Sequence, residues 1–259
     1  MDHPVLAAQL FTVRQYIQTL DGLRESIDKI CQIGYKAVQV SGIGAMANED
    51  VKRVMDDHEM TICITHISYD QLWNHTDEVI AQHKLWNCKN VAIGSMPPQF
   101  RGAEENYHRF AKEASEIGKK LADAGLTFSY HNHSFEFTRF DDKTGMDIIY
   151  GESDPRYLMA EIDTYWVQHG GADPAAWIRK MKNRMPVVHL KDMTVVPEGH
   201  GAMQMMAEVG EGNLNWPAIL AACKEAGVEW YAVEQDICQR DPFESLNISY
   251  NNLRAMGLE

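Results

Sequence analysis

Short apolar runs alternate with longer amphipathic stretches from one end of the chain to the other. The runs are rich in β-branched and aromatic residues, which is typical of buried strands. They lie near residues 5–11, 37–41, 61–67, 90–95, 126–133, 158–163, 186–191 and 230–235. Each run is followed by a stretch with helical periodicity, so the pattern predicts eight strand–helix units.

The residues at the helix boundaries agree with this pattern. Three amphipathic stretches stop at a glycine just before the next strand, at Gly34, Gly125 and Gly227. Asp173-Pro174 and Asp241-Pro242 place a capping carboxylate and a proline where two later helices begin. Strand followed by helix, repeated eight times, predicts an α/β fold, a single (β/α)8 TIM barrel.

The length of the chain allows one such barrel or two ordinary domains. No Gly/Ser-rich linker, low-complexity tract or block of charge marks a boundary, so we expect one domain over residues 1–259. A doubly wound sheet is the alternative fold, and it would carry a glycine-rich turn after the first strand. The segment 9–14 that follows this strand has no glycine.

Four of the predicted strands end in side chains that bind metals. The ends read Tyr130-His131-Asn132-His133, Glu161-Ile162-Asp163, Val188-His189-Leu190-Lys191-Asp192 and Val233-Glu234-Gln235-Asp236. In a closed parallel barrel these ends meet at one open face, and alternate residues of each strand point inward. A single buried His or Asp is about as often a hydrogen-bond partner as a ligand, but four such ends together favour a divalent cation.

The types of ligand limit the metal. Carboxylate and imidazole groups without thiolate suit Mn²⁺, Mg²⁺, Co²⁺ or Zn²⁺, and we favour Mn²⁺. The hard carboxylates of Asp163 and Glu234 would bind it directly, while His189 would supply a nitrogen. His131 and His133 are two residues apart and therefore share one face of their strand.

Composition limits the partners. The chain has 24 basic and 37 acidic side chains, for a net charge of -13, and no Lys/Arg run, so a nucleic-acid partner is not expected. Its five cysteines form no C-x-x-C pair, which is typical of reduced thiols in a cytoplasm. Residues 1–11 lack the positive region of a signal peptide and no apolar run could cross a bilayer, so we expect a cytoplasmic protein without a membrane partner. Assembly into a homo-oligomer stays open.

Taken together, the strand ends resemble those of the sugar phosphate isomerase/epimerase family of xylose isomerase-like TIM barrels, which includes ketose 3-epimerases, inosose dehydratase and C-glycoside deglycosidases. The resemblance covers essentially the whole chain. Further matching segments are Phe135-Glu136-Phe137, Thr164-Tyr165-Trp166, Gly170-Gly171-Ala172-Asp173-Pro174 and Gly210-Glu211-Gly212-Asn213-Leu214-Asn215-Trp216. It implies a metal-dependent enzyme that acts on a small carbohydrate: a sugar, a keto-sugar or a cyclitol.

The resemblance also implies a ligand set of a Glu, an Asp, a His or Gln, and a second Glu. Asp163, His189 and Glu234 match the last three. His131 stands where ketose epimerases have the first glutamate, so either His131 itself coordinates the metal or Glu136, five residues later, reaches back to it. We prefer Glu136 for its charge, which leaves the histidines free to transfer protons.

The histidine at position 131, where ketose epimerases have a glutamate, affects which reaction is expected. The two metal-bound glutamates of the epimerases serve as acid and base, so epimerisation by two glutamates becomes doubtful here. A His/Glu pair can still remove a proton next to a carbonyl and protonate a leaving group, since histidine titrates near neutrality. We therefore expect catalysis by His131, His133 and Glu234. The chain would act as a lyase or dehydratase, or as an epimerase or isomerase.

Other polar residues near the strand ends are candidates for substrate binding. His66, Gln9 and Trp166 could bind or stack on a sugar, and Lys191 could hold an oxyanion. Structural roles are about as common for such residues. Five other histidines lie on predicted helices or loops and are expected at the surface, with His169 left open: His58, His75, His83, His108 and His169.

Two alternatives to this function remain. A metal-dependent phosphodiesterase of the AP endonuclease type would need more strand-end histidines and a basic groove, and a non-catalytic sugar-binding barrel would bind no metal. The stretch Met193–Asn213 is the longest without a regular pattern, and we interpret it as a substrate lid rather than a surface insertion. No glycine-rich turn with a paired Lys or Arg follows the last two strands, so an unphosphorylated substrate is preferred.

Overall fold

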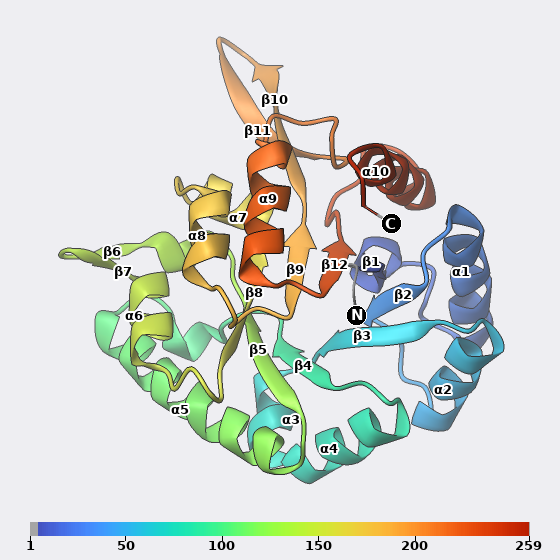
Figure 1. Cartoon of the computed structure of the whole chain (residues 1–259), viewed down its shortest axis with the longest axis horizontal. Helices are drawn as coiled ribbons and strands as arrows, with labels where there is room; N and C mark the ends of the chain where they lie inside the picture. The colour runs from blue at the N-terminus through green and yellow to red at the C-terminus, as the bar shows by residue number, and fades with distance from the viewer. Residues whose placement is uncertain (1–4, 259) are drawn as a thin grey trace.

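The computed structural model describes residues 5–258, in which eight parallel strands close into a barrel (Figure 1). The first strand pairs with both the second and the last, which completes the ring. In chain order the barrel strands are β1 (Val5–Gln9), β2 (Ala37–Val40), β3 (Thr61–His66), β4 (Asn90–Ile93), β5 (Thr127–His131), β8 (Met159–Asp163), β9 (Val187–Leu190) and β12 (Trp230–Val233). The predicted (β/α)8 barrel is confirmed.

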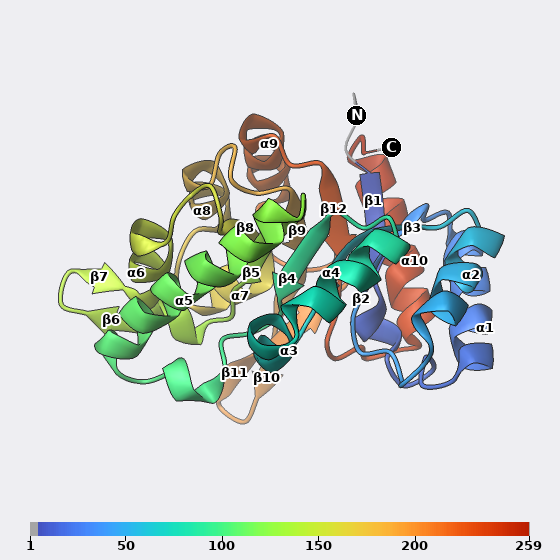
Figure 2. The same ribbon diagram turned by 90° about the horizontal axis from the view of Figure 1, so that it is seen from below.

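Helices cover the outside of the barrel (Figure 2). They are α1 (Leu20–Ile33), α2 (Asn48–Asp57), α3 (Tyr69–Asn74), α4 (Thr76–Leu85), α5 (Glu104–Asp123), α6 (Gly145–Glu152), α7 (Thr164–His169), α8 (Pro174–Lys180), α9 (Trp216–Ala226) and α10 (Pro242–Ala255). Three short 3-10 turns add η1 (Leu10–Val13), η2 (Pro98–Phe100) and η3 (Phe135–Phe137). The first predicted strand is shorter than expected because its last residues form η1, whose amide at Phe11 bonds the Gln9 side chain.

Inside the barrel, small apolar residues lie at the bottom and polar residues lie at the top. Ala7, Ala37 and Ala232 belong to the apolar cluster in the interior. Two positions further along the same strands stand Gln9, Gln39 and Glu234, all buried. This spacing of two is the strand period, so the sequence places each polar group directly above an apolar one, at the carboxyl end of its strand.

Two expectations about irregular or exposed segments are wrong. The stretch Met193–Asn213 is not irregular: most of it forms an antiparallel hairpin of β10 (Asp192–Glu198) and β11 (Gly201–Ala207). A second, smaller hairpin pairs β6 (Arg139–Phe140) with β7 (Lys143–Thr144). His83 is not at the surface but fully buried, where its ring bonds the Thr65 hydroxyl at 2.7 Å on the outer face of β3.

The fully buried carboxylate of Asp192 anchors the larger hairpin to the barrel. It accepts hydrogen bonds from the indole of Trp216 at 2.6 Å and from the amides of Gly210 and Gly212 at 2.9 and 3.1 Å. The amide of Leu214 bonds its other oxygen at 3.2 Å. A Cβ at Gly212 would lie only 2.3 Å from that carboxylate, so the chain can wrap it this tightly only with glycine there.

Asp192→Ala is expected to lower the free energy of unfolding by about 3 kcal/mol or more, since several buried donors lose a charged acceptor at once. Urea unfolding monitored by circular dichroism measures the loss. Asp173→Ala is the matched control, because Asp173 caps two amides of α8 at an exposed position, and losing a cap costs about 1 kcal/mol. Equal losses in the two variants would contradict the anchoring role.

The structure also bears on the expectations about membrane spans, cysteines and a signal peptide. Within residues 5–258 no helix has the length and apolar character that a membrane span requires. All five cysteines are free thiols. Residues 1–4, which belong to the segment considered for a signal peptide, lie outside the described residues.

Candidate metal and active site

A pocket of about 440 Å³ opens at the carboxyl ends of the barrel strands. Its floor includes His131, Lys191 and Glu234, and its rim includes Phe11 and Tyr69. A hollow of about 590 Å³ at the opposite end of the barrel has Glu229 as its single carboxylate and no histidine in its lining. The ionisable groups thus concentrate at the end where enzymes of this fold place their active sites.

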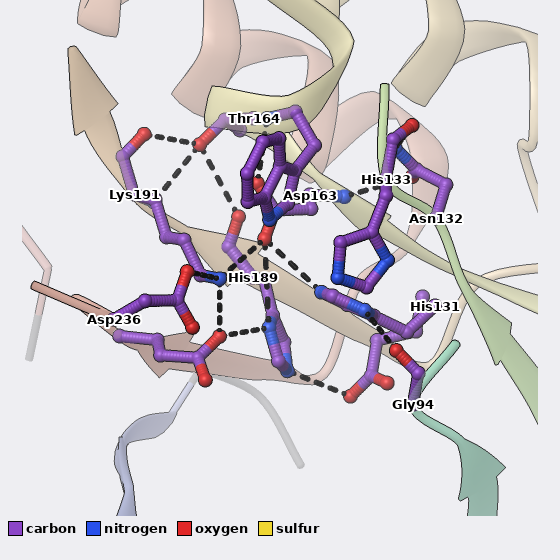
Figure 3. A network of polar contacts seen from close by, with 12 residues as sticks. Gly94, His131, Asn132, His133, Asp163, Thr164, His189, Lys191 and Asp236 are labelled. Carbon is purple, nitrogen blue, oxygen red and sulfur yellow. Dashed lines mark hydrogen bonds and ion pairs between the residues drawn. The ribbon is translucent and has the colours of Figure 1, made fainter. Parts of the chain in front are cut away.

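Four buried side chains at the floor form one compact group: His131, Asp163, His189 and Glu234. One ligand-type atom from each lies within 4.8 Å of all the others. His131 Nε2 is 3.0 Å from Asp163 Oδ2 (Figure 3). His189 Nδ1 is 2.9 Å from Glu234 Oε2. Two carboxylates and two imidazole nitrogens that converge in this way could hold a divalent cation.

The second nitrogen of each histidine is held by a fixed acceptor. His131 Nδ1 is 2.8 Å from the carbonyl oxygen of Gly94. His189 Nε2 is 2.7 Å from Gln39 Oε1 and 3.0 Å from Glu161 Oε1. Such outer contacts fix the ring orientation of metal-binding histidines and leave the other nitrogen free for the metal. The residues therefore fit a metal by their chemistry and by their surroundings.

The electrostatics of the group also favour a cation. Burial raises the pKa of Glu234, but Lys191 and His189 beside it outweigh burial and hold the pKa well below its usual range. Burial lowers the pKa of His189, yet Glu161 and Glu234 raise it to about 10. The Glu234 carboxylate is thus ionised and attracts positive charge. Because the pKa of His189 is raised, a metal that binds its nitrogen would have to displace a proton.

Lys191 brings a fixed positive charge to the same floor. Its buried ammonium is 2.6 Å from Glu234 Oε2, 2.9 Å from Asp236 Oδ2 and 3.1 Å from Asp163 Oδ2. Burial lowers the pKa of Lys191, but these three carboxylates raise it well above its usual range. Lys191 is therefore charged, and it lines the pocket.

The structure does not bring Glu136 into the four-residue group. Its buried carboxylate accepts a hydrogen bond from the Tyr130 hydroxyl and from the amide of His133 at 3.0 Å. Burial raises the pKa of Glu136 to about 7. Because Tyr130 and His131 are neighbours on β5, they point to opposite faces of the strand, and Glu136, the middle residue of η3, lies on the Tyr130 side.

The free energy of unfolding of the wild type should fall as the pH rises, because the buried Glu136 ionises; Glu136→Gln should not show this fall. The native pKa of about 7 lies above the ordinary 4.5, so this contribution to stability is full below about pH 4.5 and disappears as the pH rises through about 7. It amounts to at most about 3 kcal/mol. Glutamine keeps the bond from Tyr130 but cannot ionise, so its urea-unfolding profile should be flatter between these pH values. Parallel profiles would contradict the assignment.

Of the other candidates for substrate contact, His66 is in the pocket lining, whereas Gln9 and Trp166 are not. His66 places Nε2 at 2.8 Å from Glu161 Oε2. A Cβ at Gly94 would lie 2.6 Å from His66 Nδ1, so glycine there lets the ring pack closely. Gln9 is fully buried in the barrel interior and is not part of the pocket lining.

His133 and Trp166 form an aromatic wall. Their ring centroids are 5.1 Å apart, and His133 Nδ1 and Trp166 Nε1 are both buried without a hydrogen-bond partner among residues 5–258. Burial lowers the pKa of His133 to about 3, so the ring is neutral. The amide of Trp166 bonds Asp163 Oδ1 at 2.9 Å, which ties this wall to the four-residue group.

Sequence reasoning missed Glu161 as a site residue. Burial raises its pKa, but His189 and His66 outweigh burial and lower it, so the carboxylate is charged although fully buried. A signal was present, because Glu161 lies two positions before Asp163 and so faces the same interior. Asp236 was missed in the same way, two positions after Glu234.

Glu161→Gln is expected to weaken metal binding by about 10- to 100-fold, the usual effect of losing an outer partner of a metal-binding histidine. The variant loses the charge that makes His189 a better ligand. Competition with a chromophoric chelator measures the affinity. Glu229→Gln, at the opposite end of the barrel, is the control and should bind as the wild type does; an unchanged affinity in Glu161→Gln would contradict the role.

Comparisons with known proteins agree with this architecture. The family described as "Xylose isomerase-like TIM barrel" matches residues 27–244. An inosose dehydratase of Geobacillus thermodenitrificans (strain NG80-2) is 26% identical over 155 residues, which cover 54% of this chain and 51% of the relative, about half its length. An inosose dehydratase of Clostridium tetani (strain Massachusetts / E88) is 20% identical over 254 residues, covering 85% of each.

A solved structure shows the same fold. The sugar phosphate isomerase/epimerase from Parabacteroides distasonis ATCC 8503 superposes with a TM-score of 0.77 at 21% identity. The match covers 98% of this chain and 94% of that one. At this identity the likeness shows the fold alone.

Proposed function

The chain belongs to the xylose isomerase-like TIM barrel family, and on that premise we propose that it is a divalent-metal-dependent enzyme which removes a proton next to a carbonyl of a sugar, keto-sugar or cyclitol. The observation that carries this proposal is the buried group of His131, Asp163, His189 and Glu234 at the floor of an open pocket. Related proteins are named as dehydratases and as isomerase/epimerases, which supports an enzyme.

The metal would be held by this group, with His131 rather than Glu136 as the fourth ligand. His131 directs Nε2 at Asp163, whereas the Glu136 carboxylate is engaged by Tyr130 and His133. We keep Mn²⁺ as the favoured ion, with Mg²⁺, Co²⁺ and Zn²⁺ as alternatives. When bound, the cation polarises the substrate carbonyl and so acidifies the adjacent C–H bond.

The proton would be transferred by His133 and Glu234. His133 lines the pocket and its ring is neutral, so it would accept a proton from a bound substrate; burial lowers its pKa to about 3, which makes it a weaker base than an ordinary imidazole. Glu234 faces the same space from β12. The ammonium of Lys191 would hold the developing oxyanion, while His66 and Trp166 would orient the ring of the sugar.

Between the two reaction types we favour the lyase or dehydratase. Two glutamates, one on each face of the substrate, would be needed for epimerisation as in ketose epimerases, and His131 stands at one of those positions. In elimination, one group removes the proton from the carbon next to the carbonyl and another protonates the oxygen that leaves from the next carbon. A C–H and a C–O bond break, a C=C bond forms, and water or an alcohol departs. An imidazole and a carboxylate suit these two steps.

We propose a cytoplasmic enzyme of one domain, residues 1–259, that acts on a small molecule. The net charge of -13 disfavours a nucleic-acid partner. Lys191 is the single Lys or Arg in the pocket lining, so an unphosphorylated substrate is favoured.

The reaction type is tested by incubating the Mn²⁺-loaded protein with a panel of keto-sugars and inososes and recording ultraviolet spectra and product masses. A lyase or dehydratase gives an enone absorbance together with loss of water or an alcohol. An epimerase or isomerase gives products of unchanged mass and no new absorbance. No conversion of any substrate in the panel would count against the proposed class and favour a binding role.

A further inference from the structure

The hairpin of β10 and β11, residues 192–207, projects from the barrel as an arm. Both ribbon views show it extending beyond the helices that surround it (Figures 1 and 2). Its strands are paired at seven positions from Asp192 with Ala207 to Glu198 with Gly201. None of its residues lines the pocket at the carboxyl ends of the strands. The arm is therefore a regular structure whose residues lie outside the pocket lining.

The arm is unusual in its charge and its exposure. From Met193 to Ala207 the one formally charged residue is Glu198, in a chain with a net charge of -13. Val195 and Met203 are 48% and 45% exposed, which places both among the large apolar side chains at the surface. A two-stranded ribbon with exposed apolar side chains is marginal in water on its own, so a partner surface is expected to cover it.

The two edges of the ribbon differ. The free edge of β10 carries Pro197 and Glu198, and proline and charge are the usual means of protecting an edge strand. The free edge of β11 carries neither from Gly201 to Ala207. Within the described chain the backbone of this segment bonds only β10. One edge of the arm is thus protected against strand addition, and the other edge is open.

We propose that β11 pairs with β11 of a second copy of this chain, antiparallel about a two-fold axis near Met203, to form a four-stranded sheet. An open strand edge is complementary to itself under a two-fold axis, because antiparallel pairing matches each free donor with the symmetry-related acceptor. A second copy is the partner that the charge favours. Two acidic chains can approach closely only where neither carries carboxylates, and the β11 edge is such a place.

The base of the arm suits this role. Asp192 holds Gly210, Gly212 and Trp216 by direct hydrogen bonds, so the hairpin leaves the barrel at a fixed angle. A preformed strand loses little conformational freedom when it pairs. The contact is limited to a short ribbon, so the dimer should dissociate in the micromolar range.

Analytical ultracentrifugation of the full chain between about 1 and 100 µM tests the proposal. The wild type is expected to shift from monomer to dimer with concentration. Met203→Glu places two like charges opposite each other at the axis and should raise the dissociation constant at least about 100-fold. Val195→Glu is the matched control, since Val195 is equally exposed but lies on β10, and it should dimerise as the wild type does.

A wild type that stays monomeric at the highest concentration would overturn the proposal. So would equal effects of the two variants, whether both dissociate the dimer or neither does. If Met203→Glu fails to fold, Met203→Cys replaces it: oxidation should link two chains through this position, and Val195→Cys should not. Failure to link Met203→Cys above the level of Val195→Cys would reject the pairing. The result is independent of the proposed reaction, because no substrate takes part.

Discussion

Asp163→Asn is expected to abolish binding of a divalent metal and, with it, turnover. Asp163 Oδ2 lies 3.0 Å from His131 Nε2 and 3.8 Å from His189 Nδ1, so its carboxylate is the common neighbour of both imidazole ligands. Losing an outer partner costs about 10- to 100-fold in metal affinity, so losing this ligand should cost about 1,000-fold or more. Titration calorimetry with Mn²⁺ and metal analysis after desalting measure the loss.

Asp236→Asn is the matched control for this variant. It makes the same chemical change in the same pocket, at a carboxylate that contacts Lys191 but is outside the four-residue group. The control should retain one metal per chain. A full metal content in Asp163→Asn, or an equal loss in Asp236→Asn, would contradict the assignment of the ligands.

His133→Gln is expected to lower kcat by about 100- to 10,000-fold, the range for removing a general acid or base. The metal content should stay at the wild-type level, because the His133 ring is not part of the four-residue group. Glutamine can still donate a hydrogen bond to a substrate, so KM should change far less than kcat. Steady-state kinetics on the substrate identified by the panel, with metal analysis on the same samples, separate these effects.

His169→Gln is the control for His133→Gln. His169 belongs to the same aromatic cluster, with its ring centroid 5.4 Å from that of Trp166, but it does not line the pocket. Its variant should keep kcat within about threefold of the wild type, as expected for a residue that transfers no proton. Equal losses in the two variants would assign the effect to aromatic packing rather than to proton transfer by His133.

The barrel could be predicted because two local signals in the sequence agree. Alternation within strands and helices indicates eight strand–helix units, and the glycine stops after three of the helices agree with them; both signals act over a few residues. The strand period also predicts that Asp163, His189 and Glu234 lie on the inner face. The same rule applied two residues before Asp163 would have identified Glu161, which lies on the same inner face.

Other features depend on contacts that local patterns do not describe. Glu136 turns away from the four-residue group because a 3-10 turn directs it to Tyr130 and the His133 amide, and short turns have weak sequence signals. The arm of β10 and β11 looked irregular because both of its faces carry apolar residues, which hides the alternation of a strand. His83 was expected at the surface, yet tertiary packing of α4 on β3 supplies it with a partner at Thr65.

The central claim is that a metal held by His131, Asp163, His189 and Glu234 enables proton removal next to a carbonyl. Uptake of solvent deuterium into a keto-sugar substrate, or release of deuterium from a labelled one, measures that step whether elimination or epimerisation follows. The exchange should occur with Mn²⁺-loaded protein, stop after treatment with a chelator and return when Mn²⁺ is restored. Exchange that survives complete removal of the metal would contradict the claim. So would a fully metal-loaded protein that converts its substrate without any exchange of deuterium.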